Sequence, residues 1–463
     1  MARKKLQAAN PVTDGILNTP ANVGMAANNL MAQSNYALNA LTRNSKQLDY
    51  MYRGSWIVGA AVDAKADDMT RSGIVLSGAL DLGDDEKLQR EIDVCDVWHQ
   101  LADGIRWGRL YGGAICVILI DGQDMATPLD PATVGPRQFR GLLTMDRWQL
   151  LPAIGNLVMD LGPDYGRPMF YTPIADASMI SGQSGLINKK IHYSRVIRFE
   201  GAVLPFYQRM AEQGWGMSII ERLADRLVAY DSATQGAAQL MFKAHLRTVY
   251  IKGLTQVIAA GGPGLAALER RMASIKSYQS SEGLTVLDSE DRLEHFNNTF
   301  AGLSDMLLQF GEQIAGAIDT PLVRLLGQSP GGLGSSGESE MRNYYDATAR
   351  DQERKLRWPL TKLLQIISYS TLGRPLPEGF SFEFVNLWQT SHTEQADNAA
   401  KLTGAVVQAV SEGLVSASVG LAELRKSSAT TGLWSTIADS DIEGADDTPP
   451  KITLPGASGE ATS

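Results

Sequence analysis

The sequence predicts an α+β fold made of more than one packed unit. Apolar residues follow a helical period over residues 52–112, whereas Gly and Pro divide residues 122–189 into short strand-like pieces. From residue 218 onward the helical period returns, and two long helical segments bracket an insert with strand-like composition. The chain has 463 residues, 44% of them hydrophobic, which is enough apolar mass for two or more cores.

Charge and hydropathy narrow the function classes. A net charge of −9 argues against a protein that wraps nucleic acid, because affinity for phosphates comes from clustered Lys and Arg. It does not exclude a protein past which DNA slides. The longest uninterrupted apolar run, Ala114 to Ile120, is far below the roughly 20 residues that span a bilayer. The first residues also lack the apolar region of a signal peptide, so we expect a cytoplasmic protein without membrane association.

The first half predicts helices followed by strands. Residues 1–48 are rich in Asn, Ala and Ser, which indicates a loose, partly flexible arm or a partner-binding segment. One amphipathic helix is expected over residues 85–111, ending at Gly112 and Gly113. Its apolar face would carry Leu88, Ile92, Cys95, Trp98, Leu101, Ala102 and Ile105. The segments "AICVILIDG" and "KIHYSRVIRFEG" are expected to form strands, and both cysteines, Cys95 and Cys116, are expected to be reduced core residues.

The second half predicts a long helix, a small α/β insert and a second helix. The helices are "SIIERLADRLVAYDSATQGAAQLMFKAHL" and "LSDMLLQFGEQIAGAID", the latter ending at Thr320–Pro321. Between them, residues 243–276 carry a net charge of +5 and residues 282–294 a net charge of −4. Such a bipolar insert suits head-to-tail contacts between neighbouring subunits, contacts with another protein or DNA, or simply two solvated faces.

The stretch "LLGQSPGGLGSSGESEMRNYY", Leu325 to Tyr345, predicts a mobile neutral loop followed by a helix. It carries no charge from Gly327 to Gly337, and its glycines make it flexible. Ser335 is expected to cap the helix and to form a capping box with Glu338. The helix is expected to run for more than thirty residues with a kink at Trp358–Pro359.

Local motifs do not predict an enzyme. "GQSPG" matches a nucleophile elbow, but Pro330 has no N–H to donate to an oxyanion. "GLGSSG" matches a dinucleotide fingerprint, but no strand precedes it, and Glu338 and Glu340 would occupy the phosphate site. There is no Gly-Lys dipeptide for a Walker A loop, and each histidine is about 50 or more residues from the next. "DSDIEG" lacks the twelfth-position Glu of an EF-hand. We therefore expect no catalytic residue, no cofactor and no metal.

Three separated stretches carry a resemblance to a known family. They are "YRGSWIVGAAVDAKADDMTRSG", "IHYSRVIRFEG" and "AIDTPLVRLLGQSPGGLGSSGESEMRNYYDATARDQERKLRWPL". Together they resemble the portal proteins of tailed bacteriophages over about residues 50–425. The resemblance implies a portal fold that assembles as a ring, a dodecamer at one capsid vertex of the virion, put together in the host cytoplasm. Double-stranded DNA would pass through its channel during packaging and ejection without sequence specificity.

The resemblance also implies partners and a domain map. The partners are further copies of the chain, the terminase large subunit, the major capsid and scaffolding proteins, and a head-completion or adaptor protein. The implied map is an N-terminal arm (1–48), wing (49–215), stem helix (216–246), clip (247–298), stem helix (299–320), tunnel loop with long kinked helix and wing strand (321–391), crown helices (392–426) and flexible acidic tail (427–463).

Two sets of site residues follow from this map. The tunnel loop at the channel constriction would present Gln328, Ser329, Gly331, Gly332, Gly334, Ser335 and Ser336. A basic patch of the clip, contacting terminase, an adaptor or a neighbouring subunit, would consist of Lys252, Arg270, Arg271 and Lys276. Because the loop has no cation, a grip on DNA there would need backbone amides, hydroxyls, or Arg324 or Arg342 at its edges. The alternative is a portal-like protein with another role, or an enzyme whose site combines residues distant in sequence.

Overall fold

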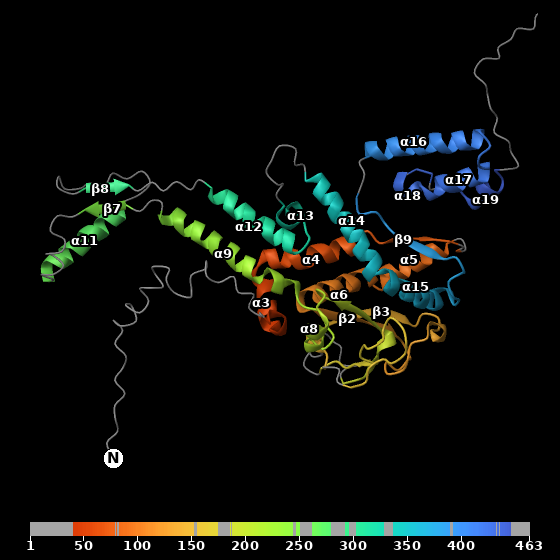
Figure 1. Ribbon diagram of the computed structural model, residues 1–463, viewed down its shortest axis with the longest axis horizontal. Coiled ribbons are helices and arrows are strands. Elements are labelled where there is room, and N and C mark those ends of the chain that lie inside the picture. The colour runs from red at the N-terminus through yellow and green to blue at the C-terminus, as the bar shows by residue number, and fades with distance from the viewer. Residues whose placement is uncertain are drawn as a thin grey trace, which may run out of the picture.

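The computed structural model describes most of the chain between residues 40 and 445 and confirms the α+β class. The described residues are 40–78, 80, 83–151, 155–174, 186, 188–243, 247–250, 262–278, 292–295, 302–327, 337–388, 392–431, 433–434 and 436–445. A mixed body holds the sheets, a pair of helices projects from it, and a group of helices lies at its other end (Figure 1).

The body begins with two helices joined at Ser55. The short turn η2 (Leu41–Arg43) leads into α3 (Ser45–Gly54), and α4 (Trp56–Thr70) follows directly. Asn44 caps α3, because its Oδ1 accepts a hydrogen bond from the Gln47 amide at 3.1 Å. Helix α4 is buried along most of its length, so its polar residues also enter the protein interior.

The expected single helix over residues 85–111 is wrong, because the segment forms two helices. α5 (Asp84–Val94) and α6 (Val97–Tyr111) are separated at Cys95 and Asp96, and Asp96 has a left-handed φ of 49°. The expected end of α6 at Gly112 is confirmed, since Gly112 has φ 85°, which favours glycine. Both cysteines are free thiols, with Cys116 buried and Cys95 half-buried.

The central sheet is antiparallel, with strand order β3-β2-β6. Its middle strand carries the expected apolar run, and Cys116 lies opposite Thr144 on one side and Ile197 on the other. Helix α6 packs on the sheet and shares a core with α5 and α15. The strands and short turns of this region are β1 (Ile74–Ser77), β2 (Gly113–Ile120), η3 (Pro131–Thr133), β3 (Phe139–Asp146), η4 (Arg147–Gln149), β4 (Phe170–Tyr171), β5 (Ile191–His192), η6 (Tyr193–Arg195) and β6 (Val196–Glu200).

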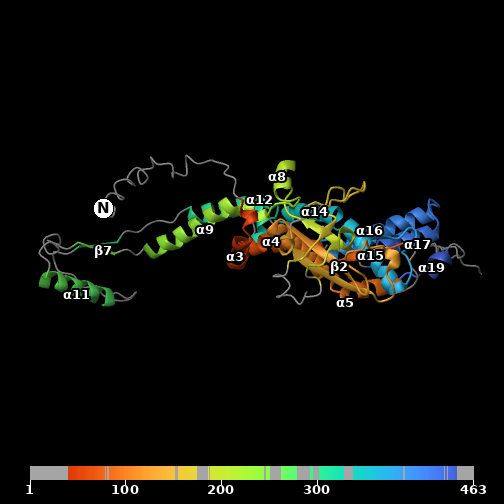
Figure 2. The ribbon, with the colours of Figure 1, turned by 90° about the horizontal axis from the view of Figure 1, so that it is seen from below.

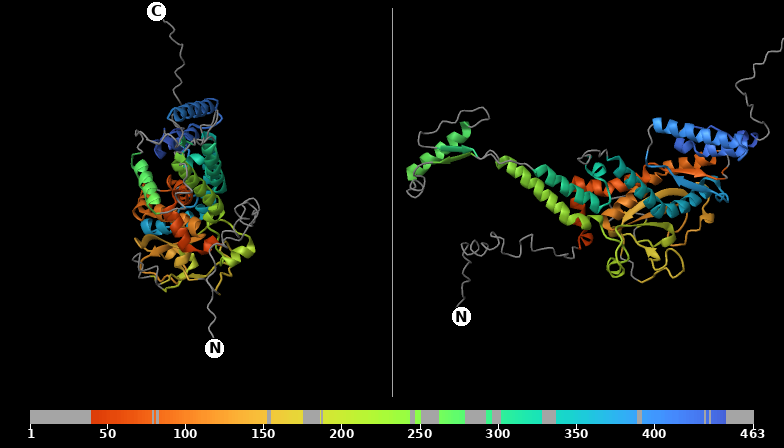
Figure 3. Two further views of the ribbon diagram at one scale, coloured as in Figure 1. Left: turned by 90° about the vertical axis from the view of Figure 1, so that its left-hand side faces the viewer. Right: turned by 45° about the horizontal axis from the view of Figure 1, so that its top comes forward.

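A pair of long helices projects from the body. α8 (Phe206–Ala211) precedes α9 (Ile219–Lys243), which packs along α12 (Leu303–Ala317). Figure 3 shows the two helices side by side, leading to a small group of elements at the far tip. That group consists of β7 (Arg247–Tyr250) paired with β8 (Arg292–His295), and α11 (Gly262–Tyr278).

The chain then returns to the body. α13 (Leu322–Leu326) follows Pro321, and α14 (Glu338–Lys355) and α15 (Arg357–Leu372) are separated only by Leu356. The expected kink is therefore confirmed as a break, because Pro359 has no N–H to donate to the carbonyl of Lys355. Strand β9 (Ser381–Phe384) pairs with β1, which lies about 300 residues earlier.

The far end of the molecule is helical. Helix α16 packs against α17, which packs against α19 (Figure 1). The bounds are α16 (His392–Ser411), α17 (Ala417–Lys426), α18 (Ser428–Thr431) and α19 (Asp439–Glu443). Within the part of the chain that is described, no helix is both long and apolar enough to cross a bilayer.

Candidate functional site at the anchors of residues 328–336

The seven predicted tunnel-loop residues lie outside the described residues, so their site is defined by its two anchors. The anchor before them is α13, which ends at Gly327 with φ 69°, and the anchor after them is α14. Helix α14 begins at Glu338, and its N-cap is Gly337 with φ 68° and without a side-chain hydrogen bond. The expected capping box between Ser335 and Glu338 is therefore wrong, because the helix begins too late for Ser335 to be its cap.

Asp68 of α4 joins both anchors. Its carboxylate is fully buried and accepts hydrogen bonds from Arg324 of α13, with Nε 2.9 Å from Oδ2 and Nη2 3.4 Å from Oδ1. The hydroxyl of Tyr344 on α14 donates to the same Oδ2 at 2.8 Å. Burying a carboxylate is unfavourable unless its oxygens are paired, so this geometry fixes α13 and α14 to α4.

A polar stripe on α14 extends the contact with α4. Tyr344, Thr348 and Gln352 recur every four residues and are buried, so they lie on one face of the helix. Lys65 Nζ donates to Thr348 Oγ1 at 3.0 Å and forms an ion pair with Asp351 at 3.2 Å. Gln352 Nε2 donates to the carbonyl of Met69 at 2.9 Å. The helix that follows residues 328–336 is therefore held by specific polar contacts as well as by apolar packing.

Burial shifts the ionisation of this cluster. Desolvation lowers the pKa of Lys65, and the nearby Asp351 carboxylate partly offsets that shift. Desolvation, together with the charge of Asp68 and the hydrogen bond to it, raises the pKa of the Tyr344 hydroxyl, which remains a donor at neutral pH. The polar contacts of this cluster thus hold α14 to α4.

The two arginines at the edges of residues 328–336 have partners within the protein. Arg324 pairs with Asp68. Arg342 pairs with Glu338 at 3.0 Å, and its guanidinium lies over the ring of Trp388 at 5.0 Å. Neither arginine is therefore fully available to bind DNA. This weakens the expectation from the sequence that Arg324 or Arg342 contacts DNA at the edge of the loop.

The predicted basic patch is only partly described. Arg270 is exposed on α11, and its Nε donates to the carbonyl of Ala266 at 3.2 Å. Arg271 and Lys276 also lie on α11, with side chains that are not described, and Lys252 lies outside the described residues. Figure 3 places α11 at the end of the helix pair farthest from the body, which leaves its exposed face accessible.

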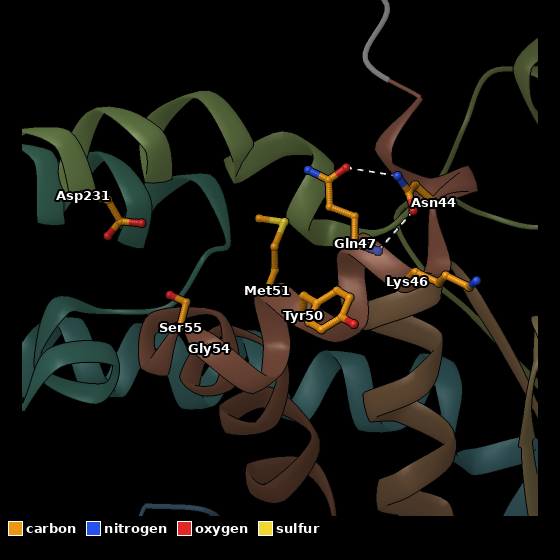
Figure 4. A pocket seen from close by; sticks show the side chains of 8 residues that line it. All are labelled: Asn44, Lys46, Gln47, Tyr50, Met51, Gly54, Ser55 and Asp231. Atoms are coloured by element: carbon orange, nitrogen blue, oxygen red, sulfur yellow. Dashed lines mark hydrogen bonds between the residues drawn. The ribbon is translucent and has the colours of Figure 1, made fainter.

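The surface hollow between α3 and α9 does not provide a catalytic set (Figure 4). Its volume is about 540 Å³, and its acidic side chain is Asp231. The lining residues are Asn44, Lys46, Gln47, Tyr50, Met51, Gly54, Ser55 and Asp231. Asn44 and Gln47 bond each other as part of the cap of α3, and His and Cys do not line the hollow. Across the part of the chain described here, no group of three His, Cys, Asp or Glu side chains could hold a metal ion.

The fold is an elongated body with a projecting helix pair (Figure 1), and one buried carboxylate binds the helices on both sides of residues 328–336. The family model described as "Phage portal protein" matches residues 46–408. The chain therefore belongs to the phage portal protein family, as its sequence motifs predicted. Neither the buried Asp68 cluster nor its link between α13 and α14 was predicted; the signal was a group of four charges in an otherwise largely apolar helical segment, Asp63, Lys65, Asp67 and Asp68.

Three solved structures are similar to this chain over most of its length. The neck of an empty GTA particle, computed with C6 symmetry, matches with 14% identity and a TM-score of 0.50, covering 82% of this chain and 93% of that chain. The neck of the native GTA particle, computed with C12 symmetry, gives 13% identity, a TM-score of 0.48 and the same coverage. An HK97 family phage portal protein from Corynebacterium diphtheriae gives 10% identity and a TM-score of 0.36, covering 72% of this chain and 95% of that chain.

Two proteins related in sequence are matched over different shares of their own length. A Haemophilus influenzae protein named "Uncharacterized protein" is 27% identical over 438 residues, which cover 93% of each chain. A Caulobacter protein named "Anti-CBASS protein Acb1" is 28% identical over 393 residues, which cover 80% of this chain but 61% of that protein. The match thus spans about three-fifths of the Caulobacter relative.

Proposed function

We propose that the chain is the subunit of a portal ring at one capsid vertex, through which double-stranded DNA enters and leaves the capsid. The family match over residues 46–408 carries this proposal. A ring of twelve is the expected size, and the neck of the empty GTA particle, which has a similar fold, is itself a rotationally symmetric assembly. The chain would then act as a structural part of the virion and not as an enzyme.

Residues 328–336 are proposed to line the narrowest part of the channel. Their composition, uncharged and rich in Gly and Ser, limits adhesion to passing phosphates. The shared carboxylate of Asp68 supports this role, because it fixes both ends of the segment to one helix of the body. A loop that contacts moving DNA needs such a mount, since force on the loop is transmitted to its anchors.

The tip of the helix pair is proposed to contact the packaging motor and later an adaptor protein. Arg270, together with Arg271 and Lys276 on the same helix, gives this tip a basic character suited to acidic partner surfaces. The proposed domain map is the one expected from sequence, with α9 and α12 as stem helices, the elements between them as the clip, and α16 and α17 as the crown.

The test is the mass of the purified full-length protein by native mass spectrometry, with negative-stain images of the same sample. Rings with a central hole support the proposal, and deletion of residues 331–336 should then reduce the DNA packaged per capsid. A protein that stays monomeric at every salt and protein concentration, and that also fails to form rings with scaffolding protein present, would overturn it.

A second candidate is a portal-like protein with another role. The observation that favours it is the name "Anti-CBASS protein Acb1" on relatives from Caulobacter and Sphingomonas. The match covers only 61% and 60% of those two proteins, so the activity behind their name is not assigned to this chain. Failure of ring formation in the experiment above would favour this candidate.

A further inference from the structure

A cleft rich in basic side chains opens where the body meets the helix pair. Its volume is about 690 Å³, and it is bordered by the α14–α15 junction, the end of β6 and the first turn of α9. Seven basic side chains line it, against four acidic ones. They are Lys65, Arg109, Arg167, Arg198, Arg222, Arg354 and Lys355, with Asp164, Glu200, Asp319 and Asp351.

Three of the four carboxylates are already paired with cations of the cleft. Asp164 bonds Arg167 at 2.5 Å, Glu200 bonds Arg198 at 3.1 Å, and Asp351 bonds Lys65 at 3.2 Å. Within the described residues, the other four cations have no carboxylate partner. They are Arg109, Arg222, Arg354 and Lys355.

Two of these four cations, Arg109 and Lys355, are half-buried. Arg109 donates from Nη2 to the backbone carbonyl of Ala61 at 2.8 Å, while its buried Nε has no partner among the described residues. Desolvation lowers the pKa of Arg109 to about 10 and also lowers the pKa of Lys355. Nearby carboxylates, Asp351 for both cations and also Asp319 for Arg109, offset this desolvation only in part, so an acidic occupant of the cleft would stabilise both cations.

The rim of the cleft continues onto an exposed apolar helix. Val203 lines the cleft and is 68% exposed, and α8 begins three residues later. The side chains of Phe206, Tyr207 and Met210 on α8 are 70%, 84% and 64% exposed. Figure 2 shows α8 standing out from one side of the body, with α5 on the opposite side. This concentration of apolar surface beside charge is typical of a protein contact.

The opposite side of the body carries the complementary charge. Residues 84–96, which form α5 and the turn after it, contain six carboxylates and two cations. Asp85, Glu86, Asp93 and Asp96 among them are exposed. Val94 lies between the acidic residues and is 75% exposed, so this face also offers an apolar contact. The chain thus has a basic face and an acidic face on opposite sides.

We propose that the basic cleft and α8 of one subunit receive the acidic α5 face of the next copy in the ring. Closed cyclic rings need such head-to-tail contacts between two different surfaces. The inference rests on the proposed function, because it assigns the ring contact of the same portal subunit. It places Arg222 and Arg354, which are exposed cations of the cleft, opposite the carboxylates of Glu86 and Asp93.

The test reverses charge on one face and then on both. The double variant Arg222→Glu/Arg354→Glu should lower the fraction of protein in rings by about tenfold or more, because like charges would face each other. Adding Glu86→Arg and Asp93→Arg in the same chain should restore rings. Lys401→Glu, on an exposed position of α16, is the control and should assemble as wild type does. Circular dichroism of each variant establishes that it is folded.

The outcomes separate this inference from the proposed function. If wild type forms rings and the cleft variant forms them equally well, the interface is wrong and the portal proposal stands. If the cleft variant forms fewer rings and the variant with all four substitutions does not regain them, the cleft does not bind the α5 face of the next subunit, and the proposed interface is wrong. If rings of the cleft variant keep their subunits but bind less DNA than wild-type rings do, the occupant is DNA and the proposal is overturned. If wild type never forms rings, the proposed function itself fails.

Discussion

Arg324 donates from Nε to Asp68 Oδ2 at 2.9 Å, between residues 256 positions apart in the sequence. Asp68 is fully buried in α4, and Arg324 lies in the last helix before residues 328–336. The hydroxyl of Tyr344, on the first helix after that segment, donates to the same oxygen atom. One carboxylate therefore fixes both sides of the segment, which couples their positions.

Asp68→Ala should destabilise the protein strongly. It leaves the Arg324 guanidinium and the Tyr344 hydroxyl without their acceptor, and breaking a buried pair in this way costs about 3–5 kcal/mol. Urea unfolding measures the change in the free energy of unfolding. Asp160→Ala, at an exposed position between β3 and β4, is the control and should change it by less than about 0.5 kcal/mol. Equal effects of the two substitutions would contradict the role of Asp68.

Tyr344→Phe should loosen α14 without removing its ring. The substitution removes one donor to a buried carboxylate, which costs about 1–3 kcal/mol. Compared with wild type, amide hydrogen exchange in the variant should become faster in residues 338–348, whereas exchange in α6 should stay the same. The matched control is Tyr345→Phe, because no hydrogen bond of the Tyr345 hydroxyl is found within the described residues and its ring packs on Trp388. Faster exchange in the control variant alone would refute the prediction.

Sequence patterns predicted helix ends and strands correctly where a local feature, such as one Gly, one Pro or one apolar run, determines the secondary structure. Gly112 ended α6, Pro359 broke the helix pair α14–α15, and the apolar run of β2 formed the central strand. The break between α5 and α6 was missed, because Asp96 in a left-handed conformation leaves no mark in the hydrophobic period. Family motifs supplied the portal fold, which periodicity alone does not specify.

The anchors of the candidate site could not be predicted from local patterns. Asp68, Arg324 and Tyr344 come from three helices, and only tertiary packing brings them together. A polar residue in a helical pattern is usually assigned to a solvated face, whereas here Asp68 and Thr348 are buried. The capping box was wrong because α14 begins at Glu338 with Gly337 as its N-cap, so Ser335 lies too early in the chain to cap it.

Gly201→Ala should destabilise the junction between the central sheet and α9. A Cβ at Gly201 would lie 2.4 Å from the carbonyl oxygen of Met217 and 2.8 Å from that of Gly108, and backbone atoms cannot move aside without shifting their strands. The expected loss is about 1–3 kcal/mol. Gly59→Ala is the matched control, because Gly59 lies within α4 with no atom near the added methyl group. It should stabilise the protein by up to about 1 kcal/mol. Thermal unfolding of both variants measures the contrast.

Lys362 makes stability depend on pH in the alkaline range. Its ammonium group donates to the carbonyl of Ser194 and lies 5.5 Å from the ring of Trp358. Desolvation lowers its pKa from the ordinary value of 10.5 to about 8, with the charge of Arg195 acting in the same direction and that of Asp164 opposing it. The unfolded chain therefore binds more protons than the folded protein between these two values, so this group makes the folded state more stable as pH rises from about 8 to 10.5.

Lys362→Met should remove this contribution, so that the change in the free energy of unfolding between pH 8 and 10.5 is less positive than in wild type. The remaining pH dependence has contributions of both signs, because burial lowers the pKa of Lys65 and Lys355 but raises the pKa of the Cys95 and Cys116 thiols. Lys46→Met, which removes the same charge from an exposed position of α3, controls for net charge. Denaturant titrations at half-unit pH intervals measure the slope. A slope for Lys362→Met equal to that of wild type would show that the Lys362 ammonium group is hydrated in the folded protein, because only a desolvated lysine favours its neutral form in this range.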